Sequence, residues 1–299
     1  MTRTEEQNKE IDGFIGDDQP DAMKIDRIAK IRGWFRPEDN SVFYPIIQDH
    51  LKKKNSLEES AKKLCTPIDE KIDARQLDDV NFMDLWYSFI YSARRIHFQD
   101  VTNHHALVDL LVAFKEHSIP NNEKYNYLFG ALSDFPMACR EAYNDQPTPG
   151  ASYALESTSW ANMNHFYALL TGREVSDRSL FGLWAMRQAL ETPHADDPQS
   201  TAIQKYDTYV PAAAVWAFGA FKVLAEKEED LTPKDNKHGN PAKGGELWKG
   251  KAEFSQARWN FWKERFAEIG KMDEVSDDTR STARDAVGSM ERALTWELV

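Results

Sequence analysis

The second half of the sequence holds six polar or aromatic residues whose side chains could line a small-molecule site. Amides and a carboxylate–guanidinium pair orient polar ligands in pockets, and an indole adds apolar contact area. The six residues are Asn162, Asn164, Arg187, Glu191, Trp248 and Arg258. The same residues can instead form a structural polar cluster, because buried polar groups that find partners fix how helices pack.

Local spacing relates two pairs among these six residues. Asn162 and Asn164 flank a methionine in an otherwise apolar stretch, so their amides must find hydrogen-bond partners if that helix is buried. Arg187 and Glu191 are four positions apart, and on a helix they most simply form a local ion pair. If both point inward, they become the floor of a polar pocket together with Asn162.

The stretch KGGELWKGKAEFSQARWNFWKERFAEIG, residues 243–270, combines aromatic and basic residues. A helix that begins near Ser255 places four large apolar residues on one face: Trp259, Trp262, Phe266 and Ile269. We therefore expect an amphipathic helix that buries its aromatic residues. The alternative is a small-molecule site at LWKGK, where Trp248 and two lysines surround a glycine that lets the backbone approach a ligand closely.

A second group of residues has the side-chain types of a metal site. His97, His104 and His105, with Asp100 between them, lie near a predicted helix junction. Adjacent histidines point in different directions on a helix, so one metal ion would need special geometry to bind both. We expect a helix cap or surface histidines here, and no metal.

The local signatures of the large enzyme classes are missing from the sequence. It contains no G-x-G-x-x-G, no G-x-x-x-x-G-K-[ST], no G-x-S-x-G and no H-E-x-x-H. The sequence therefore predicts no cofactor, and whether the protein is an enzyme stays open.

Composition limits the classes of partner. The chain has 299 residues, a formal net charge of −12 and a pI of about 5.2, which opposes binding to the phosphates of nucleic acids or to anionic membranes. No apolar run is long enough to span a bilayer, and the N-terminus lacks the apolar core of a signal peptide. The chain has only two cysteines, Cys65 and Cys139, which are too few for disulfide bonds to stabilise a protein of this size. We expect a soluble intracellular protein, in the cytoplasm.

Helix-forming patterns dominate the chain from about residue 21. Ser56 and Glu59 predict a capping box, and Pro67 is expected to end the helix that follows. The run VNFMDLWYSFIYSARRIHF from Val80 has too many apolar positions for a helix with one solvent-exposed face, so we expect a central, buried helix. Further on, Gly172 is a candidate C-cap and Pro211 suits a first helical turn.

These patterns predict an all-α fold without a substantial β-sheet. We expect a flexible acidic tail over residues 1–20 and one multi-helix domain over 21–299. The Pro/Gly connector DQPTPG at 145–150 is a possible boundary between two helical halves, and the polar segment 228–245 reads as an exposed loop.

Several pieces of the chain, taken in order, resemble one known family. These are LWYSFIYSARRIHF, SWANMNHFYALLTG, LWAMRQALET, VPAAAVWAFGAFKVL and LWKGK followed by RWNFWKERF. Together they are similar to an uncharacterised fungal helical protein family, domain of unknown function 3632. The resemblance covers most of the chain from about residue 40 and implies a helical, intracellular fungal protein, but no reaction.

Two functions of different class are consistent with the sequence. The first is a non-catalytic helical protein that acts through protein–protein contacts, because no catalytic constellation is present. The alternative is a small-molecule binder or cofactor-free enzyme with a polar pocket between helices, built from the six residues named first.

Overall fold

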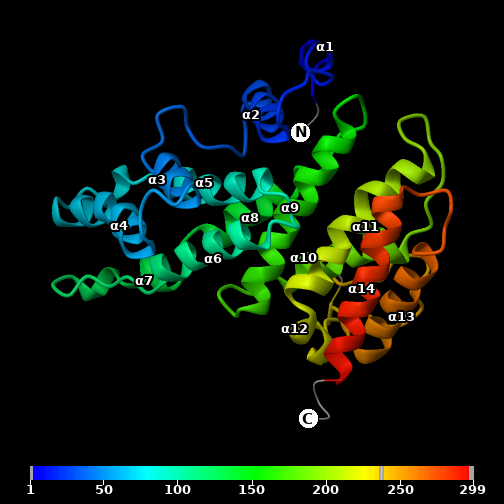
Figure 1. The fold of residues 1–299 in the computed structure, drawn as a ribbon. Helices are drawn as coiled ribbons and strands as arrows, with labels where there is room; N and C mark the ends of the chain where they lie inside the picture. Colours follow the sequence, from blue (N-terminus) through cyan, green and yellow to red (C-terminus); the bar gives the residue numbers. More distant parts are fainter. Residues whose placement is uncertain (1–2, 236, 238, 296–299) are drawn as a thin grey trace. The chain divides into compact units, whose positions relative to one another are not determined.

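The computed structural model describes residues 3–235, 237 and 239–295, and these residues are predominantly helical (Figure 1). The described residues contain one small antiparallel sheet. It consists of two strands of two residues each, β1 (Glu229–Asp230) and β2 (Glu253–Phe254). The all-α class predicted from the sequence is confirmed. The chain divides into two compact units, Met1–Gln146 and Pro147–Val299, and the division falls inside the connector at 145–150.

The first unit is organised around one buried helix. Its helices are α1 (Glu5–Asp12), α2 (Asp21–Arg32), α3 (Tyr44–Leu51), α4 (Leu57–Asp73), α5 (Phe82–Arg95), α6 (Val101–Lys115), α7 (Tyr127–Gly130) and α8 (Phe135–Tyr143), with 3-10 turns at Leu77–Asp79 and Glu123–Tyr125. The indole of Trp86 on α5 lies 5.6 Å from the ring of Phe114 and 5.1 Å from that of Phe135. Its N–H donates to the carbonyl of Ser133 at 2.7 Å. The central helix expected from Val80 onward is therefore confirmed as α5.

Two expectations for the first unit need correction. Pro67 lies inside α4, because Ile68 and Ile72 beyond it are buried and their packing outweighs the lost backbone hydrogen bond. Where the sequence suggests a flexible tail over residues 1–20, the structure has α1, which begins with a Thr4–Gln7 capping box. Ile11, with Phe14 just after the helix, is buried, and such local apolar anchors order a segment that polar composition alone would leave free.

The second unit is built on the packing of two long helices. Its helices are α9 (Tyr153–Gly172), α10 (Ser179–Met186), a π-helical turn (Arg187–Glu191), α11 (Ala202–Gly219), α12 (Phe221–Glu226), α13 (Gln256–Ile269) and α14 (Asp277–Thr295). α9 and α11 make the most extensive helix contact of this unit. α13 begins at its N-cap Ser255 and buries Trp259, Trp262, Phe266 and Ile269, as the sequence predicts.

Two residues of these long helices have other roles than expected. Gly172 ends α9 without a left-handed conformation, and a Cβ placed on it would overlap the carbonyl oxygen of Gly219 on α11. It is a close-approach residue rather than a helix cap. Pro211 lies in the middle of α11, because the capping box of Thr201 and Gln204 starts that helix nine residues earlier, at Ala202.

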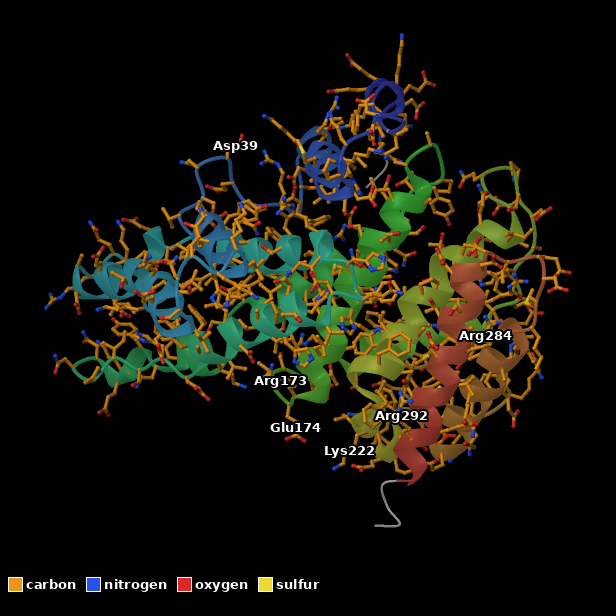
Figure 2. The ribbon with its side chains drawn as sticks, viewed as in Figure 1. Asp39, Arg173, Glu174, Lys222, Arg284 and Arg292 are labelled. Carbon is orange, nitrogen blue, oxygen red and sulfur yellow. The ribbon has the colours of Figure 1, made fainter. Side chains whose placement is uncertain are left out.

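Charged side chains cover the outside of the helices. Figure 2 shows Glu174 and Lys222 pointing away from the ribbon, and both are exposed. Arg284, also exposed, donates from Nη1 to the carbonyl of Gly270 at 2.9 Å and so caps the end of α13. Within the described residues, the helices are too short or too polar to cross a bilayer.

Candidate functional site

Glu191 is a completely buried carboxylate at the end of a π-helical turn in the second unit. The turn Arg187–Glu191 continues α10 with the wider i to i+5 hydrogen-bond spacing of a π-helix, a rare feature that is frequent at functional sites. The side chain of Glu191 is 0% exposed. A buried carboxylate is stable only when a positive charge or several hydrogen-bond donors surround it.

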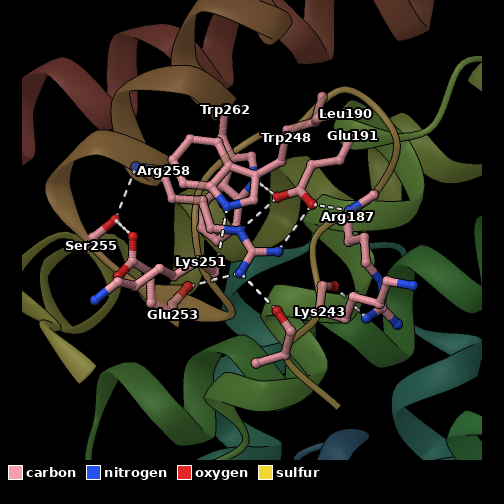
Figure 3. A network of polar contacts seen from close by, with 12 residues as sticks. Arg187, Leu190, Glu191, Lys243, Trp248, Lys251, Glu253, Ser255, Arg258 and Trp262 are labelled. Atoms are coloured by element: carbon pink, nitrogen blue, oxygen red, sulfur yellow. Dashed lines mark hydrogen bonds and ion pairs between the residues drawn. The ribbon is translucent and has the colours of Figure 1, made fainter. Parts of the chain in front are cut away.

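Arg258 on α13 supplies that charge, although it lies 67 positions further along the chain (Figure 3). Its Nε donates to Oε1 of Glu191 at 2.7 Å and its Nη2 donates to Oε2 at 2.9 Å. The guanidinium and the carboxylate therefore meet as a two-pronged ion pair, the geometry in which an arginine binds most strongly. Both side chains are 0% exposed, so the pair is shielded from water and salt.

Two further donors complete the coordination of the carboxylate. The indole N–H of Trp262, one turn after Arg258, donates to Oε1 of Glu191 at 2.7 Å. The backbone N–H of Gly245 donates to Oε2 at 2.7 Å. Each carboxylate oxygen thus accepts two hydrogen bonds, and its acceptor capacity is used.

The other nitrogen of the guanidinium fastens a loop to this pair. Nη1 of Arg258 donates to the carbonyls of Ala242 at 3.0 Å and Glu253 at 2.8 Å. The backbone N–H of Leu247 in turn donates to the carbonyl of Glu191 at 2.8 Å. We call residues 241–254 the clasp segment, and the contacts that Glu191 and Arg258 make with it the clasp.

A glycine at position 245 is required by the clasp. A Cβ placed on Gly245 would lie 2.5 Å from the carbonyl oxygen of Glu191 and 2.6 Å from its Cβ. Both atoms belong to a buried residue that cannot move without breaking the ion pair. The absence of a side chain therefore lets the loop backbone reach the carboxylate.

Trp248 folds back over the same loop. Its indole N–H donates to the carbonyl of Lys251 at 2.9 Å, and a Cβ on Gly244 would lie 2.5 Å from the indole. The Trp248 ring centre is 5.7 Å from the guanidinium carbon of Arg258 and 5.5 Å from the ring centre of Phe261. The indole is half-buried, so it covers one side of the ion pair while its outer part stays in contact with solvent.

Arg187 and Trp184 hold the start of the clasp segment. Nη1 of Arg187 donates to the carbonyls of Pro241 at 3.0 Å and Lys243 at 2.9 Å. The indole N–H of Trp184 donates to the carbonyl of Pro241 at 2.8 Å. The sequence predicts a local pair of Arg187 with Glu191. In the structure both side chains contact the clasp segment, Arg187 at its start and Glu191 at Gly245.

The two asparagines lie on α9. Nδ2 of Asn164 donates to the carbonyl of Trp160 at 3.0 Å, and its Oδ1 accepts the indole N–H of Trp216 on α11 at 2.9 Å. Asn164 therefore joins α9 to α11 inside the core. Asn162 is buried on the same helix. The structure thus brings four of the six sequence candidates to the clasp and places the two amides on α9.

The histidines near α6 have structural partners. Nε2 of His104 is 3.0 Å from the carbonyl of Ile96, and burial lowers the pKa of His104 to about 4. Asp100 caps α6 by accepting the N–H of Asn103, and the ring of His97 stacks on Phe98. Among the described residues, no three His, Cys, Asp or Glu side chains gather as metal ligands.

Sequence reasoning missed two partners of the carboxylate, the Gly245 N–H and the Trp262 indole. A signal for the indole was present, because Arg258 and Trp262 are four positions apart and so share a helix face. No local signal pointed to Gly245, whose partner lies in another part of the chain. Chemically, the arrangement can hold a loop in place, because the acceptors of Glu191 are occupied by the protein itself.

A sequence model of one family matches residues 86–266, and that family is described as "Protein of unknown function (DUF3632)". The matched range is more than half of the chain. The chain belongs to this family. Neither a curated protein nor a solved structure matches it.

The DUF3632 match contains every residue of the clasp. Glu191, the clasp segment, Arg258 and Trp262 all lie within residues 86–266, as do Asn162 and Asn164. The first four helices, α1 to α4, lie before the match. The DUF3632 domain of this protein therefore includes the complete carboxylate site.

Proposed function

We propose that this DUF3632 protein acts inside the cell through protein–protein contacts, and that the clasp segment binds an acidic segment of a partner protein. The observation that carries the proposal is a loop, the clasp segment, whose backbone is bonded to buried side chains while Lys243, Lys249 and Lys251 are exposed. The clasp segment contains three lysines and two glutamates. Residues 232–251, which include the loop before it, contain five lysines and two acidic residues, a formal net charge of +3, whereas the whole chain carries −12. A local excess of positive charge on an acidic protein favours a negatively charged partner segment.

The clasp supports the proposal by fixing the loop before a partner arrives. The N–H groups of Gly245 and Leu247 are bonded to Glu191, and the carbonyls of Ala242 and Glu253 are bonded to Arg258. A preorganised loop loses little conformational entropy on binding, and the ordering of a mobile loop is one of the costs of association.

The side chains on the outside of the clasp segment suit a protein contact. Lys243, Lys249 and Lys251 are exposed, and the half-buried Trp248 stands between them in the sequence. Tryptophan is among the residue types that contribute most to binding energy at interfaces, whereas surrounding lysines provide electrostatic selection of the partner. This combination fits an acidic peptide segment that also carries an apolar side chain.

The contacts of the cluster favour this proposal over the alternative of a small-molecule pocket or a cofactor-free active site. A catalytic carboxylate needs a free lone pair to accept a proton, but the lone pairs of Glu191 already accept four hydrogen bonds from the protein. The cluster therefore acts as the support of a contact surface.

Binding of a fluorescent glutamate-rich peptide tests the proposal. We expect the full chain to bind this peptide with an affinity that falls as salt is raised, and the double variant Lys243→Glu/Lys249→Glu to bind roughly tenfold more weakly. The matched control is Lys52→Glu/Lys62→Glu, which makes the same charge change at exposed lysines of the first unit. Equal weakening by both double variants would show that only net charge matters and would reject the clasp segment as the contact surface.

A further inference from the structure

The sequence contains four Thr-Pro steps, and they differ in accessibility. They are Thr66-Pro67, Thr148-Pro149, Thr192-Pro193 and Thr232-Pro233. All four threonines lie in the described part of the chain, and of these only Thr232 is exposed. The hydroxyl of Thr66 donates to the carbonyl of Lys62 inside α4, and that of Thr192 donates to the carbonyl of Arg187.

Thr232 also lies in the kind of backbone that an enzyme active site can bind. It follows β1 and precedes a segment without helix or strand, and the proline after it favours an extended conformation. Protein kinases bind their substrates as exposed, extended segments, so residues inside helices such as Thr66 are poor substrates.

The surroundings of Thr232 link it to the clasp segment. Its backbone N–H donates to Oδ1 of Asp230 at 2.9 Å, and its hydroxyl bonds to the same carboxylate. Oδ2 of Asp230 pairs with Nζ of Lys251 at 3.3 Å. The N–H of Leu231 donates to the carbonyl of Ala252 at 2.8 Å. Thr232 and Lys251, a lysine of the proposed contact surface, thus contact the same carboxylate.

We propose that Thr232 is a phosphorylation site for a proline-directed protein kinase that uses a nucleoside triphosphate. The hydroxyl oxygen of Thr232 forms a bond to the γ-phosphorus while the bond from that phosphorus to the bridging β,γ-oxygen breaks. The hydroxyl proton passes to a base of the kinase, and the nucleoside diphosphate leaves. Lys234 follows the proline in the sequence, and Lys251 already pairs with the carboxylate that Thr232 contacts, so both are candidates to neutralise the new phosphate.

Phosphorylation would change the charge and the contacts of the loop together. It replaces the hydroxyl donor to Asp230 with a group of about −2 charge, so that attraction becomes repulsion between two anions. The phosphate also competes with Asp230 for Lys251. The net charge of residues 232–251 falls from +3 to about +1, which weakens attraction for an acidic partner. This last consequence rests on the proposed function, whereas the modification site does not.

The site is tested by incubating the full chain with a purified proline-directed Ser/Thr kinase and ATP and mapping phosphate by peptide mass spectrometry. We expect about one phosphate per folded chain, on Thr232, none in Thr232→Ala, and restored incorporation in Thr232→Ser. Phosphate on Thr66, Thr148 or Thr192 at equal rate, or no incorporation by the folded chain, would overturn the proposal. Chain unfolded in urea and then diluted serves as the control in which every Thr-Pro step is accessible.

A second measurement separates this proposal from the proposed function. The chain phosphorylated at Thr232 is compared with the unmodified chain for binding of the glutamate-rich peptide and for amide exchange at Leu231. We expect severalfold weaker binding and faster exchange. Phosphorylation with faster exchange but unchanged binding would uphold the Thr232 site and contradict the contact surface. Unchanged exchange at Leu231 would contradict the predicted loss of the Asp230 contacts.

Discussion

Gly172 at the end of α9 and Gly219 at the end of α11 lie backbone to backbone. A Cβ on Gly172 would overlap the Gly219 carbonyl oxygen, and one on Gly219 would lie 2.9 Å from the Cβ of Ala168. The closest approach of the two main helices of the second unit therefore depends on two residues without side chains.

Replacing Gly172 by alanine should destabilise the protein. We expect the free energy of unfolding to fall by about 1–3 kcal/mol in urea denaturation, because the helices must separate to admit a methyl group. Gly288→Ala is the matched control, since a Cβ on Gly288 in α14 would make only an ordinary contact with Nη1 of Arg292, at 3.8 Å, and this variant should gain about 0.5–1 kcal/mol from better helix propensity. Equal effects at both sites would contradict the close approach.

Removing the charge of Glu191 should lower the free energy of unfolding more than the Gly172→Ala substitution does. Glu191→Gln leaves the buried guanidinium of Arg258 without a counter-charge, and we expect a loss of about 3–5 kcal/mol in the free energy of unfolding. Glu268→Gln removes an exposed ion pair with Arg265 and should cost less than about 1 kcal/mol. A small effect of Glu191→Gln would mean that the ion pair is not shielded from solvent.

The hydrogen bond between Trp216 and Asn164 gives a further test. Trp216→Phe leaves Oδ1 of Asn164 without its indole donor in the core, and we expect a loss of at least about 1–3 kcal/mol, measured by urea denaturation. In Trp248→Phe the lost donor to Lys251 lies at the surface, where water can replace it. A larger loss in the free energy of unfolding for Trp248→Phe than for Trp216→Phe would contradict this account.

Acid should destabilise the first unit through His104. Burial lowers the pKa of His104 to about 4, whereas the ordinary value is 6.5. Between these two values the unfolded chain binds a proton that the folded chain does not, so stability falls as the pH is lowered from about 6.5 to about 4, by up to about 3 kcal/mol. His104→Gln should flatten this dependence in urea titrations, and His105→Gln, at an exposed position, should leave it unchanged.

The helical fold was predictable because its signals are local. Ser56 starts α4 as its capping box predicts, α13 begins next to Ser255 as expected, and the apolar run from Val80 forms the buried α5. The helix boundaries predicted at Pro67 and Pro211 were wrong, because the packing of buried residues on both sides keeps each helix continuous at the cost of one hydrogen bond.

The clasp was only partly predictable for the opposite reason. Glu191 and Arg258 could be named as polar candidates, but their pairing depends on a π-helical turn and on a loop that returns from Glu253 to the same place. The i, i+4 spacing pointed only to Arg187 as a partner of Glu191, and it could not reveal Arg258, because spacing along one helix carries no information about a charge 67 positions away.

The clasp segment should also resist proteolysis more than the loop before it. Gly245→Ala places a methyl group against Glu191 and should release the loop, so we expect faster cleavage by trypsin after Lys243 and Lys249. Gly130→Ala, at a glycine with open space around it, is the control and should leave cleavage unchanged. Identical digestion patterns for the two variants would contradict the role of Gly245.

The most direct test of the clasp is hydrogen exchange of the Gly245 amide, followed by NMR in the intact protein and in Glu191→Gln under conditions where both are folded. The structure predicts strong protection in the unmodified protein, because this N–H donates to Oε2 of Glu191 at 2.7 Å, and at least tenfold faster exchange in the variant, with unchanged protection in α5 of the first unit. Equal exchange rates of the Gly245 amide in the two proteins would contradict the claim that the Glu191 carboxylate holds the clasp segment in place.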